Sequence, residues 1–188
     1  MLTHAALSGP MRDADLTGAE LSGAGLSSIV LDGAAMGGAV ATGADVNGVS
    51  MIDAFAPRLS MPRTLIRGAQ LRAANLDEAD FAGATISDST FAAAPLRRAT
   101  FTAATFDKVN LAYTGLVDAK LNHVDAVSSD PRGGRRSSLF LADLTGATLA
   151  GSEWDDDEAG DRPWEWATLC HTVLPVDAEA SGDHDCPR

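Results

Sequence analysis

Residues 69–81 read AQLRAANLDEADF, and within them the large apolar residues and the alanines both recur every five positions. The same period runs from Leu16 to Ala126, where no centre of a five-residue unit is polar and the residue two positions earlier is most often alanine. An α-helix requires apolar spacings of three and four, and a strand requires alternation, so neither element explains this period. The repeat must therefore be the basis of the fold. The centres are Leu16, Leu21, Leu26, Leu31, Met36, Ala41, Val46, Met51, Ala56, Met61, Ile66, Leu71, Leu76, Phe81, Ile86, Phe91, Leu96, Phe101, Phe106, Leu111, Leu116, Leu121 and Ala126.

The units Ala14-Asp15-Leu16, Ala74-Asn75-Leu76 and Ala79-Asp80-Phe81 resemble the pentapeptide-repeat family. This resemblance implies an all-β fold, a right-handed quadrilateral β-helix or solenoid, with four units per coil and with the centre and the small residue pointing inward. Stacked coils would lie about 4.8 Å apart, and each coil would bury its inward residues only against its neighbours. Residues twenty apart should then lie above one another, which predicts an outer column of alternating charge made of Arg58, Glu78, Arg98 and Asp118.

The five-residue period is lost after Ala126 and resumes at Leu139, a step that is not a multiple of five. The intervening residues 127–138 are rich in turn-forming residue types and are expected to bulge as a loop. We therefore expect a β-helix over residues 1–154 with this inserted loop, followed by a short irregular capping segment over 155–188. Trp164, Trp166 and Leu169 should cover the exposed end of the solenoid.

The net charge of −12 and the pI of about 4.5 argue against direct binding to nucleic acid or to an anionic membrane. Both partners carry dense negative charge that Lys and Arg must neutralise. The first residues lack the basic and apolar pattern of a secretory signal, and no apolar stretch reaches about eighteen residues. These features favour a soluble, cytoplasmic protein.

Catalytic motifs are not evident in the sequence. Its four histidines, His4, His123, His171 and His184, do not stand in a nucleophile-elbow, HExxH or phosphate-loop context. We therefore expect a non-catalytic scaffold with no catalytic residue and no cofactor. The alternative is a small-molecule-binding protein or a biosynthetic enzyme with a site on the outer surface, near Tyr113 and His123.

Cys170 and Cys186 are the only two cysteines. They could close a terminal loop as a disulfide, or bind zinc together with His171, His184 and Asp185. Adjacent ligands such as Cys170 and His171 cannot easily reach one tetrahedral ion, which favours a plain cap and no metal site. The sequence does not settle whether the disulfide forms.

The family resemblance also implies a protein partner, because members that protect type II topoisomerases from quinolones act as DNA mimics. The most specific prediction is a protein that binds DNA gyrase and gives antibiotic resistance or toxin self-protection. Its N-terminal coils, with six acids against one base up to residue 53, would carry the mimicking surface at Asp15, Glu20, Asp32, Asp45 and Asp53. The loop offers a second contact through Arg132, Arg135 and Arg136, since loops on rigid scaffolds often carry recognition. The C-terminal cap is a candidate contact for a homodimer.

Overall fold

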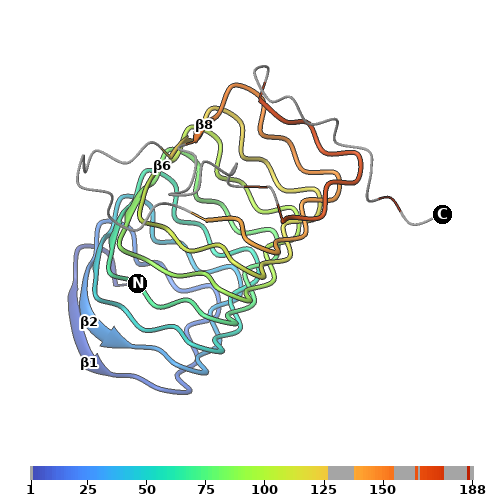
Figure 1. Ribbon diagram of the computed structural model, residues 1–188. Coiled ribbons are helices and arrows are strands. Elements are labelled where there is room, and N and C mark those ends of the chain that lie inside the picture. The colour runs from blue at the N-terminus through green and yellow to red at the C-terminus, as the bar shows by residue number, and fades with distance from the viewer. Residues whose placement is uncertain (1, 127–137, 155–163, 165, 176–185, 187–188) are drawn as a thin grey trace.

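The computed structural model describes residues 2–126, 138–154, 164, 166–175 and 186. Eight short parallel strands form one sheet in chain order, and the coils advance along one axis without doubling back (Figure 1). Within the described residues there is no helix of the length and apolarity needed to cross a membrane. The strands are β1 (Ala6–Pro10), β2 (Gly25–Val30), β3 (Asp45–Asn47), β4 (Leu65–Arg67), β5 (Thr85–Ser87), β6 (Thr105–Asp107), β7 (Asp125–Ala126) and β8 (Glu153–Trp154).

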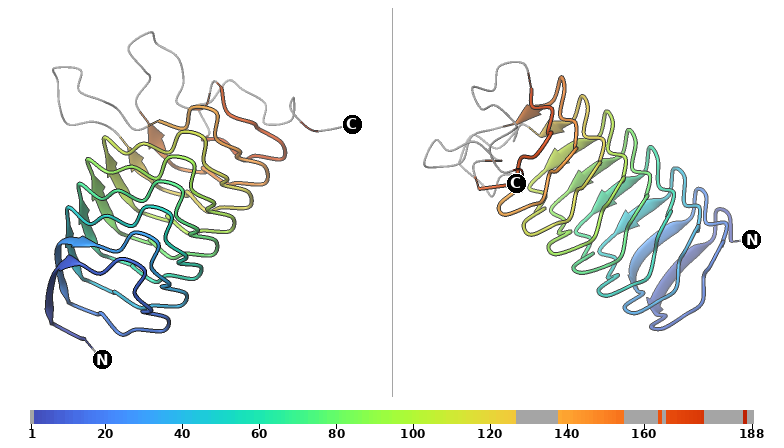
Figure 2. Two further views of the ribbon diagram at one scale, coloured as in Figure 1. Left: turned by 90° about the horizontal axis from the view of Figure 1, so that it is seen from below. Right: turned by 90° about the vertical axis from the view of Figure 1, so that its right-hand side faces the viewer.

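The sheet is one of four sides of a solenoid, and the other three sides are held by isolated parallel bridges. The pairs Asp15↔Ala35, Glu20↔Val40 and Val30↔Ser50 all join residues twenty apart, as do the paired residues of β2 and β3. Four five-residue units therefore complete one coil, and the predicted quadrilateral β-helix is confirmed (Figure 2). We number the faces by their stacked centres. Face 1 carries Leu16, Met36, Ala56, Leu76, Leu96 and Leu116; face 2 carries Leu21, Ala41, Met61, Phe81, Phe101 and Leu121; face 3 carries Leu26, Val46, Ile66, Ile86, Phe106 and Ala126; face 4 carries Leu31, Met51, Leu71, Phe91 and Leu111.

Tight turns make the corners of each coil. In one of these the N–H of Ala14 donates to the carbonyl of Met11, and the same closure recurs in other units. The second residue after a centre has positive φ, for example +64° at Gly18 and +58° at Arg58 and Ala103. A type II turn requires this conformation, which glycine adopts without steric cost and other residues adopt at some expense. Side chains at these positions project from the corners of the solenoid.

The interior is filled by the centres and the small residues. Phe81 and Phe101 stack on neighbouring coils of face 2, with ring centroids 5.1 Å apart and planes 7° apart, and Phe106 packs edge-on against Phe101. Where threonine replaces the inward alanine, its hydroxyl donates to a backbone carbonyl: Thr64 to Ala41 at 3.1 Å. The buried hydroxyl is thus satisfied, which explains why the repeat tolerates Thr at an inward position.

Two interruptions lengthen the later coils without ending them. The pairs Asn110↔Ser138 and Gly115↔Asp143 are twenty-eight residues apart, eight more than in a regular coil. The pair Asp143↔Thr168 is twenty-five apart, five more than in a regular coil. Coil stacking therefore continues past residue 154 as far as Thr148↔Val173.

Both interruptions leave the coil after face 3. The first follows β7 and the second follows β8, and these two strands pair with each other through Asp125↔Glu153 and Ala126↔Trp154. The chain is described again from Ser138 in the first case and at Trp164 in the second. Trp164 and Leu169 are buried in the core, as expected for residues that close the end, whereas Trp166 is exposed. The prediction that Trp166 helps to cover the end was wrong, because it occupies an outward corner position.

The register predicts how much of the first interruption can be removed. Deleting residues 129–136 leaves four residues between Ala126 and Leu139, which is the regular spacing, and should lower the free energy of unfolding by about 1 kcal/mol or less. Deleting residues 128–136 leaves three, too few to complete the corner in register. Thermal unfolding should separate the two variants, and equal melting temperatures would contradict the proposed eight-residue insertion.

The close packing of the interior predicts a large loss of stability when a large core side chain is removed. Replacing Phe101 by Ala should lower the free energy of unfolding by about 3–5 kcal/mol, because the stacked rings around it hold their positions and leave a cavity. Phe55 is a matched control, since its side chain points outward and is 57% exposed. Phe55→Ala should change stability by about 0.5 kcal/mol or less. Denaturant unfolding of both variants checks the assignment, and similar losses would mean that the inward register is wrong.

Candidate functional site

Four large apolar side chains project from one corner of the solenoid, between faces 4 and 1, at its C-terminal end. They are Tyr113, Phe140, Leu141 and Trp166, each between 40% and 61% exposed, and we call them the apolar ridge. Tyr113, Leu141 and Trp166 each stand two residues after a buried residue of face 4, on three successive coils. The N–H of Tyr113 donates to the carbonyl of Phe140 at 2.9 Å, and the two rings meet edge to face at 5.8 Å. The corner geometry therefore lines up side chains that are far apart in sequence.

Among the residues that the structure describes, the surroundings of the apolar ridge carry little charge. The coil before it contributes Ala92 and Ala93, Ala112 directly precedes Tyr113, and Gly115 lies on the adjoining part of face 1. The nearby acid Asp143 accepts a hydrogen bond at 3.0 Å from the backbone N–H of Thr145. Contiguous exposed apolar surface on a soluble protein commonly marks an interaction site.

Both interruptions of the coil rejoin it next to the apolar ridge. Ser138 follows the first interruption and lies two residues before Phe140, whose N–H donates to the Ser138 hydroxyl at 3.2 Å. Trp164 follows the second and lies two residues before Trp166. The predicted contact residues Arg132, Arg135 and Arg136 belong to the first interruption and lie outside the described residues.

The five acids predicted to form a DNA-mimicking surface do not share one face. Asp15 lies on face 1, Glu20 on face 2 and Asp45 on face 3, while Asp32 and Asp53 lie in turns at the corner between faces 4 and 1. The structure thus places them around the whole circumference of the N-terminal coils.

Two of these acids have close partners. Asp32 is 3.6 Å from the guanidinium of Arg12 and accepts a hydrogen bond from the N–H of Ile52. The N–H of Thr17 donates to Asp15 at 3.0 Å, and this hydrogen bond lowers the pKa of the Asp15 carboxyl. Asp15 is therefore a stable negative charge at neutral pH, whereas the charge of Asp32 is partly offset.

The predicted column of alternating charge is present at the corner between faces 1 and 2. Glu78 and Arg98 form an ion pair at 2.8 Å, and in the adjoining column Asp77 accepts a hydrogen bond from the backbone N–H of Arg97.

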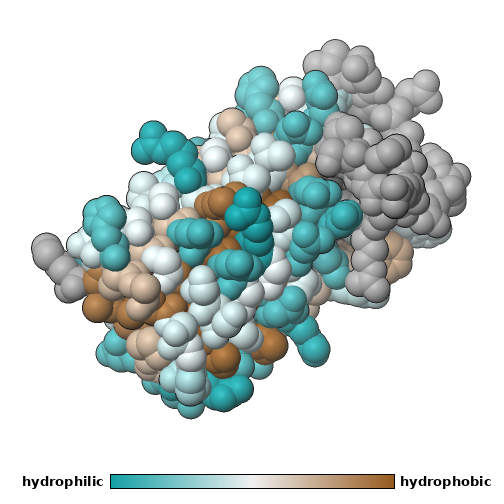
Figure 3. Space-filling model, turned by 90° about the vertical axis from the view of Figure 1, so that its left-hand side faces the viewer, coloured by the Kyte–Doolittle hydropathy of each residue, from teal (hydrophilic) through white to brown (hydrophobic). Residues whose placement is uncertain are grey.

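Figure 3 looks onto the side of the molecule that carries the strands, where hydrophobic residues form small separate patches among hydrophilic ones. These surfaces are mixed in character, unlike the apolar ridge.

Tyr113 and His123, the outward residues named for the alternative small-molecule site, lie on different corners of the coil. Tyr113 lies at the corner between faces 4 and 1, whereas His123 lies two corners further along the same coil, between faces 2 and 3. A four-sided coil places these two corners diagonally opposite, so the two side chains do not converge on one ligand.

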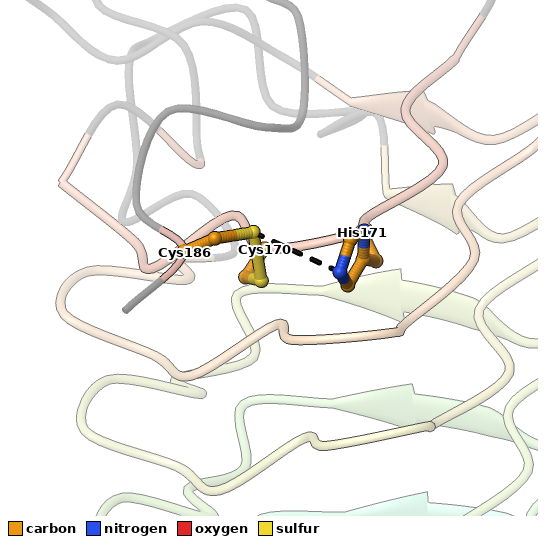
Figure 4. A group of neighbouring side chains, drawn as sticks. All are labelled: Cys170, His171 and Cys186. Atoms are coloured by element: carbon orange, nitrogen blue, oxygen red, sulfur yellow. Dashed lines mark hydrogen bonds between the residues drawn. A yellow bond between two sulfur atoms is a disulfide. The ribbon is translucent and has the colours of Figure 1, made fainter. Parts of the chain in front are cut away.

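The two cysteines are joined. Cys170 and Cys186 form a disulfide with their Cα atoms 4.8 Å apart, which answers the question that the sequence left open. The imidazole of His171 lies beside them, with its Nε2 atom 3.9 Å from the sulfur of Cys186 (Figure 4). His184 and Asp185, the other residues considered as zinc ligands, lie outside the described residues.

The apolar ridge was missed at the sequence level, although a signal for it exists. The two residues after a centre are mostly small or polar in the early coils, and become Tyr113, Phe140, Leu141 and Trp166 in the late ones. That change is visible only when the outward positions are aligned by coil, and the two interruptions shift this alignment.

Comparison with known proteins agrees with the architecture. The family model described as pentapeptide repeats matches residues 11–49 and 66–102 with eight copies. The structure is similar to that of QnrB1, a plasmid-mediated fluoroquinolone resistance protein, with a TM-score of 0.51 and 14% identity over 90% of this chain and 93% of QnrB1.

A second solved structure in this group is HetL, a pentapeptide repeat protein involved in heterocyst differentiation regulation in the cyanobacterium Nostoc. It shares 22% identity over 93% of this chain and 91% of its own, with a TM-score of 0.33. No curated protein matches the sequence significantly.

Proposed function

Because the chain is a pentapeptide-repeat protein, we propose that it is a non-catalytic scaffold that binds another protein through the apolar ridge. The observation that carries this proposal is the alignment of Tyr113, Leu141 and Trp166 on one corner of three successive coils. Aromatic side chains of this kind supply most of the binding energy in many protein interfaces.

The rigidity of the scaffold supports the same function. The corner residues are held by hydrogen bonds between coils, as between Tyr113 and Phe140, so their backbone is ordered before any partner arrives. Binding then costs little conformational entropy in this part of the interface. The interior of the solenoid offers no comparable binding surface, because its centres and small residues pack tightly against one another.

A more specific proposal is that the partner is a type II topoisomerase such as DNA gyrase. The similarity to QnrB1 over most of both chains supports it at the level of the fold. A DNA duplex presents phosphates around its whole circumference, and the five acids of the N-terminal coils likewise surround the solenoid axis. In this arrangement the acids would supply duplex-like charge, while the apolar ridge and the segment containing Arg132, Arg135 and Arg136 would supply specific contacts. The protein would then protect the enzyme from an antibiotic or toxin in the cytoplasm.

A gyrase supercoiling assay containing a fluoroquinolone tests this proposal. We expect the protein to restore supercoiling, and Trp166→Ala to raise the concentration needed for half-restoration by about 10-fold or more, since loss of a central aromatic contact typically costs about 2 kcal/mol. Phe55→Ala is the matched control, because Phe55 is also an exposed aromatic residue but lies on an early coil of face 1. It should change that concentration by less than about twofold.

Three outcomes of these experiments would correct the proposal. Failure to restore supercoiling would remove the topoisomerase as partner, and equal effects of the two substitutions would remove the apolar ridge from the contact. Sedimentation equilibrium provides the third test. A dimer that Trp166→Ala converts to a monomer would show that the apolar ridge binds a second copy of this chain instead of a different protein.

A further inference from the structure

Cys170, His171 and Cys186 bring three metal-ligand atoms together at the C-terminal end of the solenoid, all within 4.8 Å of one another. Zinc bound to thiolate and imidazole has Zn–S and Zn–N distances of about 2.3 and 2.1 Å, so its tetrahedral ligand atoms lie about 3.6–3.8 Å apart. The Nε2 atom of His171 is 3.9 Å from the sulfur of Cys186, close to that spacing. The adjacency of Cys170 and His171 in the sequence therefore does not keep their side chains apart.

We propose that the disulfide is one of two forms of this cross-link and that, after reduction, Cys170, Cys186 and His171 bind a zinc ion. The three residues would supply two thiolates and one imidazole, a ligand set that zinc favours. Because His171 is exposed, the fourth coordination position would be open to water. In both forms Cys186 stays attached to the last coil.

The local fold fixes two of the three ligands in place. The carbonyl of Cys170 accepts a hydrogen bond at 2.7 Å from the N–H of Gly146 on the coil before it. The next residues are held as well, because the hydroxyl of Thr172 donates to the carbonyl of Leu144 at 2.6 Å. His171 has φ of +53° and stands on a corner, where its ring is directed toward the sulfurs (Figure 4). Breaking the disulfide would therefore leave Cys170 and His171 positioned for a metal ion.

The exchange between the two forms is chemically balanced. A dithiol reductant gives two electrons and two protons to the disulfide, so the S–S bond breaks, two thiols form, and the reductant becomes a disulfide itself. Zinc then displaces one proton from each thiol as two S–Zn bonds form. In the reverse direction the two thiolates give two electrons to a disulfide oxidant, whose S–S bond breaks to leave two thiolates, while the zinc ion is released and the S–S bond between Cys170 and Cys186 forms again.

The exchange would let Cys186 stay joined to the last coil in both oxidising and reducing compartments. Disulfides persist mainly in oxidising compartments and are rare in the reducing cytosol. With zinc available, the reduced form would keep the same two chain segments joined in the cytosol. The cross-link would therefore not depend on the redox state of the surroundings.

Zinc titration of the protein after reduction by a phosphine tests the proposal, since a phosphine adds no competing thiol. We expect one zinc ion per chain, no zinc binding by the oxidised protein, and recovery of the melting temperature that reduction lowers. Substituting cobalt for zinc should give the absorption of tetrahedral cobalt bound to thiolate. His171→Ala should bind zinc at least about 10-fold more weakly, and His123→Ala, on a different corner and an earlier coil, should bind it like the unchanged protein.

Several outcomes would overturn the proposal. They are an absence of zinc binding after reduction, equal zinc affinity in the Cys186→Ser variant, and equal affinity in His171→Ala. Circular dichroism of each reduced protein provides the folding control, because the β signal should remain when the cross-link is open. His171→Ala leaves both cysteines in place, so its oxidised form should melt like the unchanged protein, and a loss of zinc affinity in that variant reports on the metal site and not on folding.

Discussion

The stacking of each coil on the next in a twenty-residue register is the constraint on which the rest of this structure depends. Backbone N–H groups donate to carbonyls of the adjoining coil on every face, as Leu16 does to Ala35 and Leu21 to Val40. A single coil could not bury its inward residues, so each coil is stable only against its neighbours. Every outward side chain is consequently assigned to a face or a corner by its position in the five-residue unit.

This constraint also explains how the two interruptions are accommodated. Eight and five extra residues lengthen single coils, and yet Thr148 still pairs with Val173 on face 2. Both departures occur after face 3, where β7 and β8 pair, so the stacking of faces 1 and 2 is preserved. The late coils are therefore free to change their outward residues at the corner between faces 4 and 1, and the apolar ridge arises there.

Much of the fold could be predicted from the sequence, because the inward positions obey a strict rule. Phe101 and Ala99 are buried for the same reason as every other centre and small residue, and the charge pair Glu78–Arg98 follows from the twenty-residue step. The candidate site could not be predicted in the same way. Its outward residues follow no repeat, and the interruptions hide the fact that Tyr113 and Trp166 share a corner. Trp166 was assigned to the covered end because it is a tryptophan, whereas its place in the unit directs it outward. The disulfide was equally beyond the sequence, since it depends on where Cys186 lies relative to the last coil.

The neighbouring tryptophans provide the most direct test of this account. Trp164 and Trp166 are two residues apart, and the coil register buries the first and exposes the second. Hydroxyl-radical footprinting with mass spectrometry measures the solvent exposure of each ring in the free protein. We predict that Trp166 is oxidised much faster than Trp164, at a rate similar to that of the exposed ring of Tyr113 after correction for their intrinsic reactivities. Equal oxidation of the two tryptophans, or faster oxidation of Trp164, would contradict the register of the last coil and with it the apolar ridge.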